Sequence, residues 1–299
     1  MGKIAVTLPQ ALAQRVQEGA RGSITARPLA QGENWDVADI LCTFGPRDQP
    51  FEERHAGMCI AMVVAGSFGY RAGTGRELLT SGALLLGNAG DCFECGHRHG
   101  AGDRCISFRY APAYFERLAA DAGIGSGNLN FRRARIPSLP ALSPLIARAC
   151  VGASDAGDAV WDELAVELAV STLKAAGALT RGEPPASAAA WSRVAQTARL
   201  IDDTPGAPHT LASLAAAAGL SEFYFLRTFQ RVTGVTPHQY LLRSRLRAAA
   251  QRLQDGSAKV VDIALDCGFN DLSNFNHAFR AEFAASPRAW RAWGRARRA

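Results

Sequence analysis

The sequence contains no apolar run approaching the roughly 20 residues that a membrane-spanning helix needs. The first 14 residues also lack an uninterrupted signal-peptide core, because they include Lys3 and the helix-breaking Pro9. Both absences predict a cytoplasmic protein with no membrane partner. Disorder is excluded too, since 48% of the 299 residues are hydrophobic, enough for one large domain or two ordinary ones.

The sequence also lacks the even set of cysteines typical of a disulfide framework. Its seven cysteines are an odd number, and in a reducing compartment they indicate free thiols or metal ligands.

The first two thirds of the chain lack any excess of positive charge. Residues 1–190 hold 18 Lys and Arg against 19 Asp and Glu, whereas residues 191–299 hold 15 against 8. The C-terminal third is therefore expected to meet a polyanion.

The two ends of the chain follow different patterns. From Ile24 to about Tyr110, short apolar stretches alternate with Gly-rich breaks, which predicts a small β-barrel or sandwich. From Pro112 onward the apolar spacing becomes helical, and the whole fold class is α+β. Three helices are expected first, over residues 114–122, 142–151 and 160–179. The last of these either packs on its own β-domain or forms a homodimer interface.

A Pro- and Gly-containing stretch, residues 180–190, is expected to separate two domains. The predicted division is an effector-sensing and dimerising domain over residues 1–183, a linker over 184–190 and a DNA-binding domain over 191–299.

A weak internal repeat occupies the C-terminal third. Similar residues lie at a fixed offset in its two copies. At an offset of 49 residues, the counterparts of Leu214, Ala215, Gly219 and Leu220 are Ile263, Ala264, Gly268 and Phe269. At an offset of 50, those of Phe225, Phe229, Pro237 and Tyr240 are Phe275, Phe279, Pro287 and Trp290. Each copy reads as an Ala-rich helix, a Gly turn and a second helix. Two crossing helices need a small residue where they approach and a Gly where the chain leaves the first helix. The sequence therefore predicts two helix-turn-helix units, joined by a basic helix over residues 237–253.

The segments LxxLAxxAGLS, FLRTFQRVTGVTPHQYLLRSRLRAAAQRL and VVDIALDCGFNDLSNFNHAFRAEFAASPRAW resemble the DNA-binding region of AraC/XylS-type transcription regulators. The resemblance covers roughly residues 194–293. It departs from the usual pattern at His277, where Arg is common, and at Ala284 and Ala285, where Gly often lies. It implies a cytoplasmic regulator and not an enzyme, with double-stranded DNA, an unknown effector and, for an activator, RNA polymerase as partners.

The expected DNA contacts lie on the second helix of each unit. Ser221 is placed as an N-cap, and a helical wheel puts Phe223 and Arg227 opposite the buried Phe side chains, flanked by Tyr224 and Arg231. The family's base-reading positions correspond to Phe223, Leu226 and Arg227, and in the second unit to Leu272, Ser273, Asn274 and His277; the wheel adds Asn270 there. Arg227 suits a guanine edge and Asn274 an adenine edge, although Arg227 contacting phosphate or pairing internally stays an alternative. Arg280, Arg288 and the terminal RARRA are phosphate candidates.

The basic helix between the units carries Arg243, Arg245 and Arg247, which cannot all face one way. One or two of them are expected to contact phosphate or pair internally, and the rest are expected to form a solvated face. If this helix holds the reading helices about 34 Å apart, one chain can enter two successive major grooves.

The resemblance implies a cupin-like barrel in the N-terminal half. The His, His and Glu set of a cupin enzyme is missing from the strands before the cupin-like turn of residues 82–90. The alternative function is nevertheless a cupin-type enzyme, or a cysteine-based DNA methyl acceptor, fused to helix-turn-helix units.

Soft metal ligands cluster in the segment CFECGHRHGAGDRC. They are Cys92, Cys95, His97, His99 and Cys105. Thiolates and imidazoles at this density predict a site for Zn²⁺ or another thiophilic ion, with a redox sensor or plain buried packing as alternatives. The effector is accordingly a small molecule, a metal or a redox signal.

Overall fold

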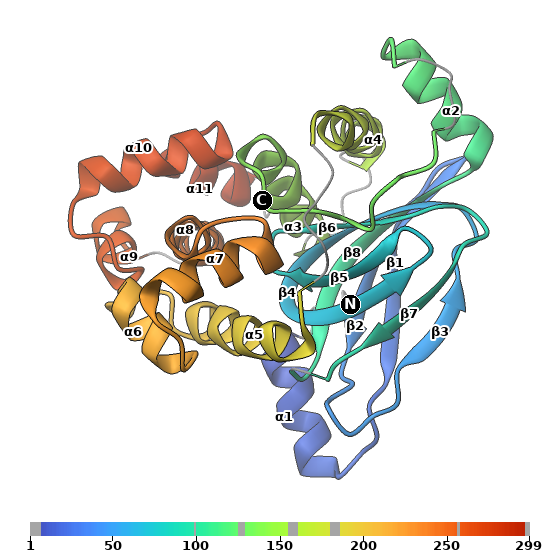
Figure 1. Ribbon diagram of the computed structural model, residues 1–299. Helices are drawn as coiled ribbons and strands as arrows, with labels where there is room; N and C mark the ends of the chain where they lie inside the picture. Colours follow the sequence, from blue (N-terminus) through green and yellow to red (C-terminus); the bar gives the residue numbers. More distant parts are fainter. Residues whose placement is uncertain are drawn as a thin grey trace.

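The computed structural model describes residues 7–98, 100–124, 129–154, 161–179, 186–255 and 258–296. Strands make up most of the N-terminal half, and the C-terminal half is entirely helical (Figure 1). None of the helices described is long and apolar enough to cross a membrane.

The N-terminal half is organised around one long strand, β4 (Met58–Ala72). Its first part pairs with β8 and β6 in one sheet, and its second part pairs with β5 and β7 in another. The other strands are β1 (Ile24–Gln31), β2 (Trp35–Cys42), β3 (Phe51–Arg54), β5 (Gly75–Thr80), β6 (Leu84–Gly87), β7 (Cys92–Gly96), β8 (Asp103–Tyr110) and β9 (Arg135–Ile136).

Strand β4 passes from one sheet to the other at Gly66. A register shift lies between Val63 and Ala65, and Gly66 has a φ of +75°. A Cβ at Gly66 would lie 2.3 Å from the carbonyl oxygen of Gly102, so only glycine fits. The strand order ends at β1 and β9, which do not pair in the described part of the chain. Of the barrel or sandwich expected from the sequence, a closed barrel is therefore not formed by the described residues, in which β4 divides its pairing between two sheets.

The alternation of side chains along β4 separates two apolar cores. Ile60 and Met62 pack toward helices that cover the first sheet, in one cluster with Trp161. Cys59 and Val63 point to the opposite side, into a second cluster between the two sheets. Cysteines of the N-terminal half are thus brought into an apolar interior.

Helices cover the first sheet close to where the sequence predicted them. They are α2 (Pro112–Asp121), the short 3₁₀ helix η1 (Pro140–Leu142), α3 (Ser143–Ser154) and α4 (Trp161–Ala178), and α1 (Leu8–Glu18) precedes the strands. The buried face of α4, including Leu164 and Leu168, belongs to the core of its own domain. Of the two alternatives for this helix, packing on its own sheet is confirmed for that face.

The C-terminal half consists of seven helices in the described residues. They are α5 (Ala188–Asp203), α6 (Leu211–Ala217), α7 (Glu222–Thr233), α8 (Pro237–Asp255), α9 (Val260–Asp266), α10 (Leu272–Phe283) and α11 (Pro287–Ala296). Helix α5 begins at Ala188 and is capped by Ser187, whose hydroxyl accepts from the amide of Ala190. The last three residues of the expected linker are therefore helical, and residues 180–185 lie outside the described residues.

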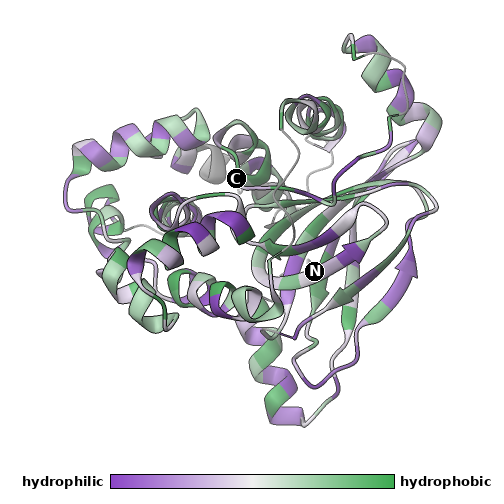
Figure 2. Ribbon diagram, viewed as in Figure 1, coloured by the Kyte–Doolittle hydropathy of each residue, from purple (hydrophilic) through white to green (hydrophobic). Residues whose placement is uncertain are grey.

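The internal repeat is visible in the burial of side chains. Residues 221–230 and 271–280 show the same order of exposed, half-buried and buried positions. Each unit has its own apolar core, one centred on Phe225 and Phe229 and the other on Phe275 and Phe279. Figure 2 shows hydrophilic and hydrophobic residues alternating along α10, as an amphipathic helix requires. The predicted duplication is confirmed.

The two units differ where their second helices end. Gly234 ends α7 with a φ of +80°, whereas Ala284 ends α10 in the same left-handed region with a φ of +53°. A Cβ is unfavourable there, by about 1–2 kcal/mol. Replacing Ala284 with glycine removes this strain but increases the entropy of the unfolded chain.

We predict that Ala284→Gly raises the free energy of unfolding by about 0.5–1 kcal/mol in urea titrations followed by circular dichroism. Ala281→Gly is the matched control, because Ala281 is exposed inside α10 and glycine there lowers stability by about 1 kcal/mol. Equal destabilisation by both substitutions would contradict the strain at Ala284.

A second prediction concerns pH and the buried His55. Burial lowers the pKa of His55 to about 4, and the Asp91 carboxylate opposes the shift. The imidazole shares a 2.8 Å hydrogen bond with the Tyr70 phenol and stacks on Phe93. Because the unfolded chain binds this proton near pH 6.5 and the folded chain near pH 4, stability from the neutral ring is present above pH 6.5 and lost between these values.

We therefore expect the free energy of unfolding of the wild type to fall more between pH 6.5 and 4 than that of His55→Gln. Urea titrations at several pH values measure this difference. Identical pH dependence of the two proteins would show that His55 is free to ionise in the folded state.

Candidate DNA-binding surface

The first helix-turn-helix unit consists of α6 and α7. The chain turns between them at Gly219, which has a φ of +63°. The Ser221 hydroxyl accepts from the amide of Tyr224, which confirms the predicted N-cap. Phe225 and Phe229 are fully buried, and this orients the opposite face of α7 toward solvent.

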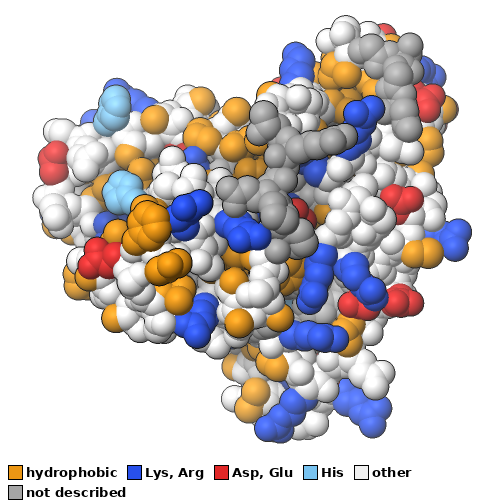
Figure 3. Space-filling model, in the orientation of Figure 1, with side chains coloured by type: hydrophobic (Ala, Val, Ile, Leu, Met, Phe, Trp, Pro, Cys, Tyr) orange, Lys and Arg blue, Asp and Glu red, His pale blue; other side chains and the backbone are white. Residues whose placement is uncertain are grey.

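That face of α7 combines aromatic rings with positive charge. The side chains of Phe223 and Tyr224 are 63% and 66% exposed, and their ring centroids lie 5.9 Å apart. The Arg227 guanidinium lies 5.8 Å from the centre of the Phe223 ring. Leu226 is half-buried, and Arg231 is exposed one turn beyond Arg227. Figure 3 shows hydrophobic and basic side chains side by side over α7.

The second unit, α9 and α10, repeats the geometry with a different cap. Asp271 accepts hydrogen bonds from the amides of Ser273 and Asn274 at 2.9 and 3.0 Å. The sequence analysis did not identify this cap. The signal for it was present, because Asp271 lies 50 residues after Ser221, at the offset of the repeat.

The solvent-facing side of α10 is polar where α7 is aromatic. Phe275 and Phe279 fix its buried face. The predicted contact residues of this unit are all exposed: Asn270, Leu272, Ser273, Asn274, His277 and Arg280. This face offers an amide and an imidazole in place of the Arg227 guanidinium.

Three of the arginines of α8, namely Arg243, Arg245 and Arg247, do not belong to this surface. Arg243 is buried, donates to the carbonyl oxygen of Ser138 and lies 3.5 Å from the Glu282 carboxylate. Arg245 donates to two carbonyl oxygens before α6, and Arg247 pairs with Asp202 at 3.4 Å. All three therefore pair within the protein, and the expectation that some of them form a solvated face is wrong. Figure 1 shows α8 between the two reading helices.

Other basic candidates remain at the edge of the surface. Arg280 and Arg288 are exposed. The side chains of the terminal RARRA lie outside the described part of the chain.

The predicted metal ligands are divided by the structure. Cys95, His97 and Cys105 are buried, whereas Cys92 is exposed on the other face of β7, and His99 lies outside the described residues. Two residues outside the predicted ligand set, Cys42 and Asp103, lie beside His97 instead.

Comparison with known proteins locates similarity in the helical half. The family described as a helix-turn-helix domain matches residues 214–292. A probable transcriptional regulator, LumQ of Photobacterium leiognathi, is 37% identical over 78 residues, which are 26% of this chain and 32% of LumQ. The transcriptional activator RhaS of Escherichia coli O139:H28 is 48% identical over 62 residues, 21% of this chain and 22% of RhaS.

The matched part thus spans a third or less of these relatives. Among solved structures, a transcriptional regulator with an AraC-type DNA-binding domain from Chromobacterium violaceum is 30% identical. The likeness covers 36% of this chain and 96% of that one, with a TM-score of 0.34. With the duplicated geometry of α6–α7 and α9–α10, the sequence matches show that this chain carries at its C-terminus the helix-turn-helix domain of AraC-type transcription regulators.

Proposed function

We propose that this protein is a sequence-specific transcription regulator that reads two successive major grooves with α7 and α10. The observation that carries the proposal is the repeated burial pattern, which leaves equivalent faces of the two helices exposed. The regulator and activator named among the matched proteins support this function and not the enzyme alternative. If the protein is an activator, the proposal also includes contact with RNA polymerase.

In this proposal the two helices read different base edges. Arg227 donates to a guanine in two parallel hydrogen bonds, and Phe223 and Leu226 contact thymine methyl groups. Asn274 pairs with an adenine edge, with Leu272, Ser273 and His277 beside it. Ser221, Tyr224, Arg231, Asn270 and Arg280 hold the phosphate backbone around these contacts.

The methyl-acceptor alternative requires a reactive thiolate that reaches DNA. Burial raises the pKa of the Cys95 and Cys105 thiols well above their usual range, so neither is a thiolate at neutral pH. Cys92 is exposed, but it belongs to the sheet half and not to the helix-turn-helix units.

Control of DNA binding by the N-terminal half is supported by contacts at the ends of both reading helices. The side chain of Arg135, the first residue of β9, is 9% exposed and pairs with Glu77 at 3.0 Å. It also donates to the carbonyl oxygen of Thr233, the last residue of α7. The Ser143 hydroxyl, at the start of α3, donates to Glu282 near the end of α10. One short segment, residues 135–143, thus contacts both units.

A cleft also lies between the halves, with a volume of about 1330 Å³. Its walls come from α1, the first sheet, α3, α5 and α8. A small-molecule effector bound there would contact both halves at once. The cupin-like character of the sensing domain and a homodimer remain parts of the proposal.

The test of base reading is Arg227→Ala in the full chain, with a DNA site selected from random duplexes. We expect specific binding to weaken by about 1–3 kcal/mol and the preference to relax at one or two base positions. Arg280→Ala is the matched control, because loss of a phosphate contact weakens specific and random DNA alike and reduces the salt dependence. Equal loss on both DNAs for Arg227→Ala would make it a phosphate contact.

The proposed domain division has its own test. Among the described residues, the apolar cores of the two units are built almost entirely from C-terminal side chains, and the N-terminal half contributes Leu78 and Ala147. We therefore expect a chain starting at Ala186 to unfold cooperatively on heating and to bind DNA as a monomer. Circular dichroism and analytical ultracentrifugation measure this, and a fragment without a melting transition would place the boundary elsewhere.

A further inference from the structure

A cluster of three potential metal ligands lies between the two sheets. One ligand atom from each of Cys42, His97 and Asp103 lies within 4.8 Å of the others, and all three residues are buried. Cys42 is the last residue of β2 and Asp103 the first of β8, and the strand register pairs them directly. His97 follows β7. The backbone therefore brings residues from three strands to one point.

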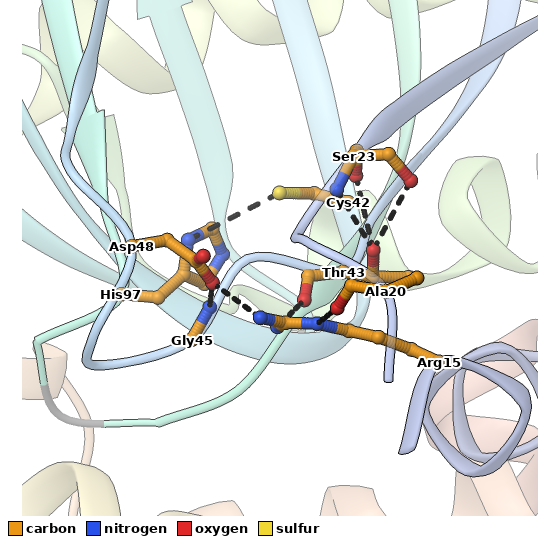
Figure 4. A network of polar contacts seen from close by, with 8 residues as sticks. All are labelled: Arg15, Ala20, Ser23, Cys42, Thr43, Gly45, Asp48 and His97. Atoms are coloured by element: carbon orange, nitrogen blue, oxygen red, sulfur yellow. Dashed lines mark hydrogen bonds and ion pairs between the residues drawn. The ribbon is translucent and has the colours of Figure 1, made fainter. Parts of the chain in front are cut away.

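The orientation of the His97 ring is that of a metal ligand with a supporting carboxylate. Its Nε2 lies 2.6 Å from Oδ1 of Asp103. Its Nδ1 faces the Cys42 sulfur at 4.0 Å, as Figure 4 shows. Metal-bound histidines commonly donate their other N–H to a carboxylate. Around a tetrahedral zinc ion with usual bond lengths, sulfur and nitrogen ligands lie about 3.5 Å apart, so a shift of about half an ångström admits the ion.

Further thiol donors surround this group. The Cys105 thiol donates to Oδ2 of Asp103 at 3.2 Å, and Cys95 belongs to the same buried cluster between the sheets. The rings of Phe44 and Phe68 lie against His97 and exclude water from one side. A site that combines thiolate, imidazole and carboxylate ligands and is shielded from water favours the binding of zinc over that of magnesium or calcium.

We propose that Cys42, His97 and Asp103 bind a zinc-like thiophilic divalent cation. Cys105, whose thiol lies 3.2 Å from Oδ2 of Asp103, becomes the fourth donor by moving toward the ion. This set differs from the one predicted from the local segment. Cys92 is on the exposed face, while Cys42 and Asp103 enter through strand pairing. Asp103 serves either as a direct ligand or as the carboxylate that orients His97.

The ligand loop also contacts the DNA-binding half. Gly100 lies between His97 and Asp103, and a Cβ added to it would lie 1.8 Å from a guanidinium nitrogen of Arg199 on α5. On the other side, Thr43 follows Cys42 and its carbonyl oxygen accepts from Arg15 of α1, as Figure 4 shows. An ion that draws the three ligands together therefore moves segments that border α1 and α5. This part of the inference rests on the proposed DNA-binding function, whereas the metal site does not.

The experiment uses the full chain, purified without chelators, stripped with a chelator and titrated with Co²⁺ and then Zn²⁺. We expect one equivalent of Co²⁺ with the intense visible absorption of a tetrahedral site and a near-ultraviolet thiolate-to-cobalt band, both removed by Zn²⁺. Cys42→Ser and Asp103→Asn are expected to weaken binding at least tenfold. Cys92→Ser is the matched control and is expected to bind like the wild type.

Three results would overturn the metal site. They are the absence of a cobalt spectrum in the wild type, unchanged affinity in both Cys42→Ser and Asp103→Asn, and loss of binding in Cys92→Ser. Asp103→Asn keeps the size of the side chain, and near-ultraviolet circular dichroism of each variant identifies loss of folding. Zinc protection of the thiols of the folded wild type from a thiol reagent supplies an independent readout, in which unprotected Cys42 also overturns the proposal.

DNA affinity of the wild type with and without zinc separates the two inferences. A zinc-dependent change of at least threefold supports the coupling through Gly100, and no change overturns that coupling while the cobalt spectrum still decides the metal site. Failure of the protein to bind DNA in either state would count against the proposed function alone.

Discussion

The arrangement of the two reading helices depends on a buried carboxylate, Glu282. It lies near the C-terminal end of α10, is 9% exposed and has partners from two other elements, the Arg243 guanidinium of α8 and the Ser143 hydroxyl of α3. Charges removed from water in this way add little net stability, but removal of one partner leaves the other uncompensated, at a cost of about 3–5 kcal/mol. The pair therefore acts as a geometric constraint. It fixes α10 against the connecting helix and against the N-terminal half at the same time.

Arg135 makes a comparable contact at the first unit. Burial lowers the pKa of Arg135 and the Glu77 carboxylate opposes this, so the guanidinium is held in place by a charge of its own domain while it donates to the end of α7. The two reading helices thus have separate attachments to residues 135–143. A change in the N-terminal half that shifts this segment alters both helices together, whereas a change at one attachment alters the distance between them.

The sequence predicted well what depends on local periodicity. Phe225 and Phe229 are one helical turn apart, so they fix which face of α7 is buried, and the repeat transfers the same reasoning to α10. The serine before α7 was recognised for the same reason, since its cap depends on residues two and three positions away. Ala188 was missed because a run of small residues after two prolines has no apolar period. The Ser187 N-cap and the packing of Trp191 and Val194 in the core of the first unit start α5 there.

Features that depend on strand pairing were not accessible in this way. Cys42 and Asp103 are 61 positions apart, and only the register of β2 and β8 places them together. The short apolar stretches predicted a barrel or a sandwich without deciding between them, and the resemblance implied the barrel. Whether the sheet closes depends on strand pairing, and β4 divides its pairing between two sheets at Gly66. Cys92 was included among the ligands because of its spacing to Cys95, although three residues along a strand reverse the direction of a side chain.

The internal pairing of arginines also changes how the positive charge of the C-terminal third is understood. The excess there predicted a polyanion partner, yet Arg193, Arg243, Arg245 and Arg247 all donate to groups of the protein itself. They donate to backbone carbonyl oxygens or pair with the carboxylates of Asp202 and Glu282, and so they stabilise the fold that presents α7 and α10. Each phosphate contact contributes a slope of about −0.9 to the salt dependence of binding. With those four arginines withdrawn, the proposed binding of DNA depends more on the exposed aromatic, amide and arginine groups of α7 and α10, which are also the groups that we propose distinguish one base pair from another.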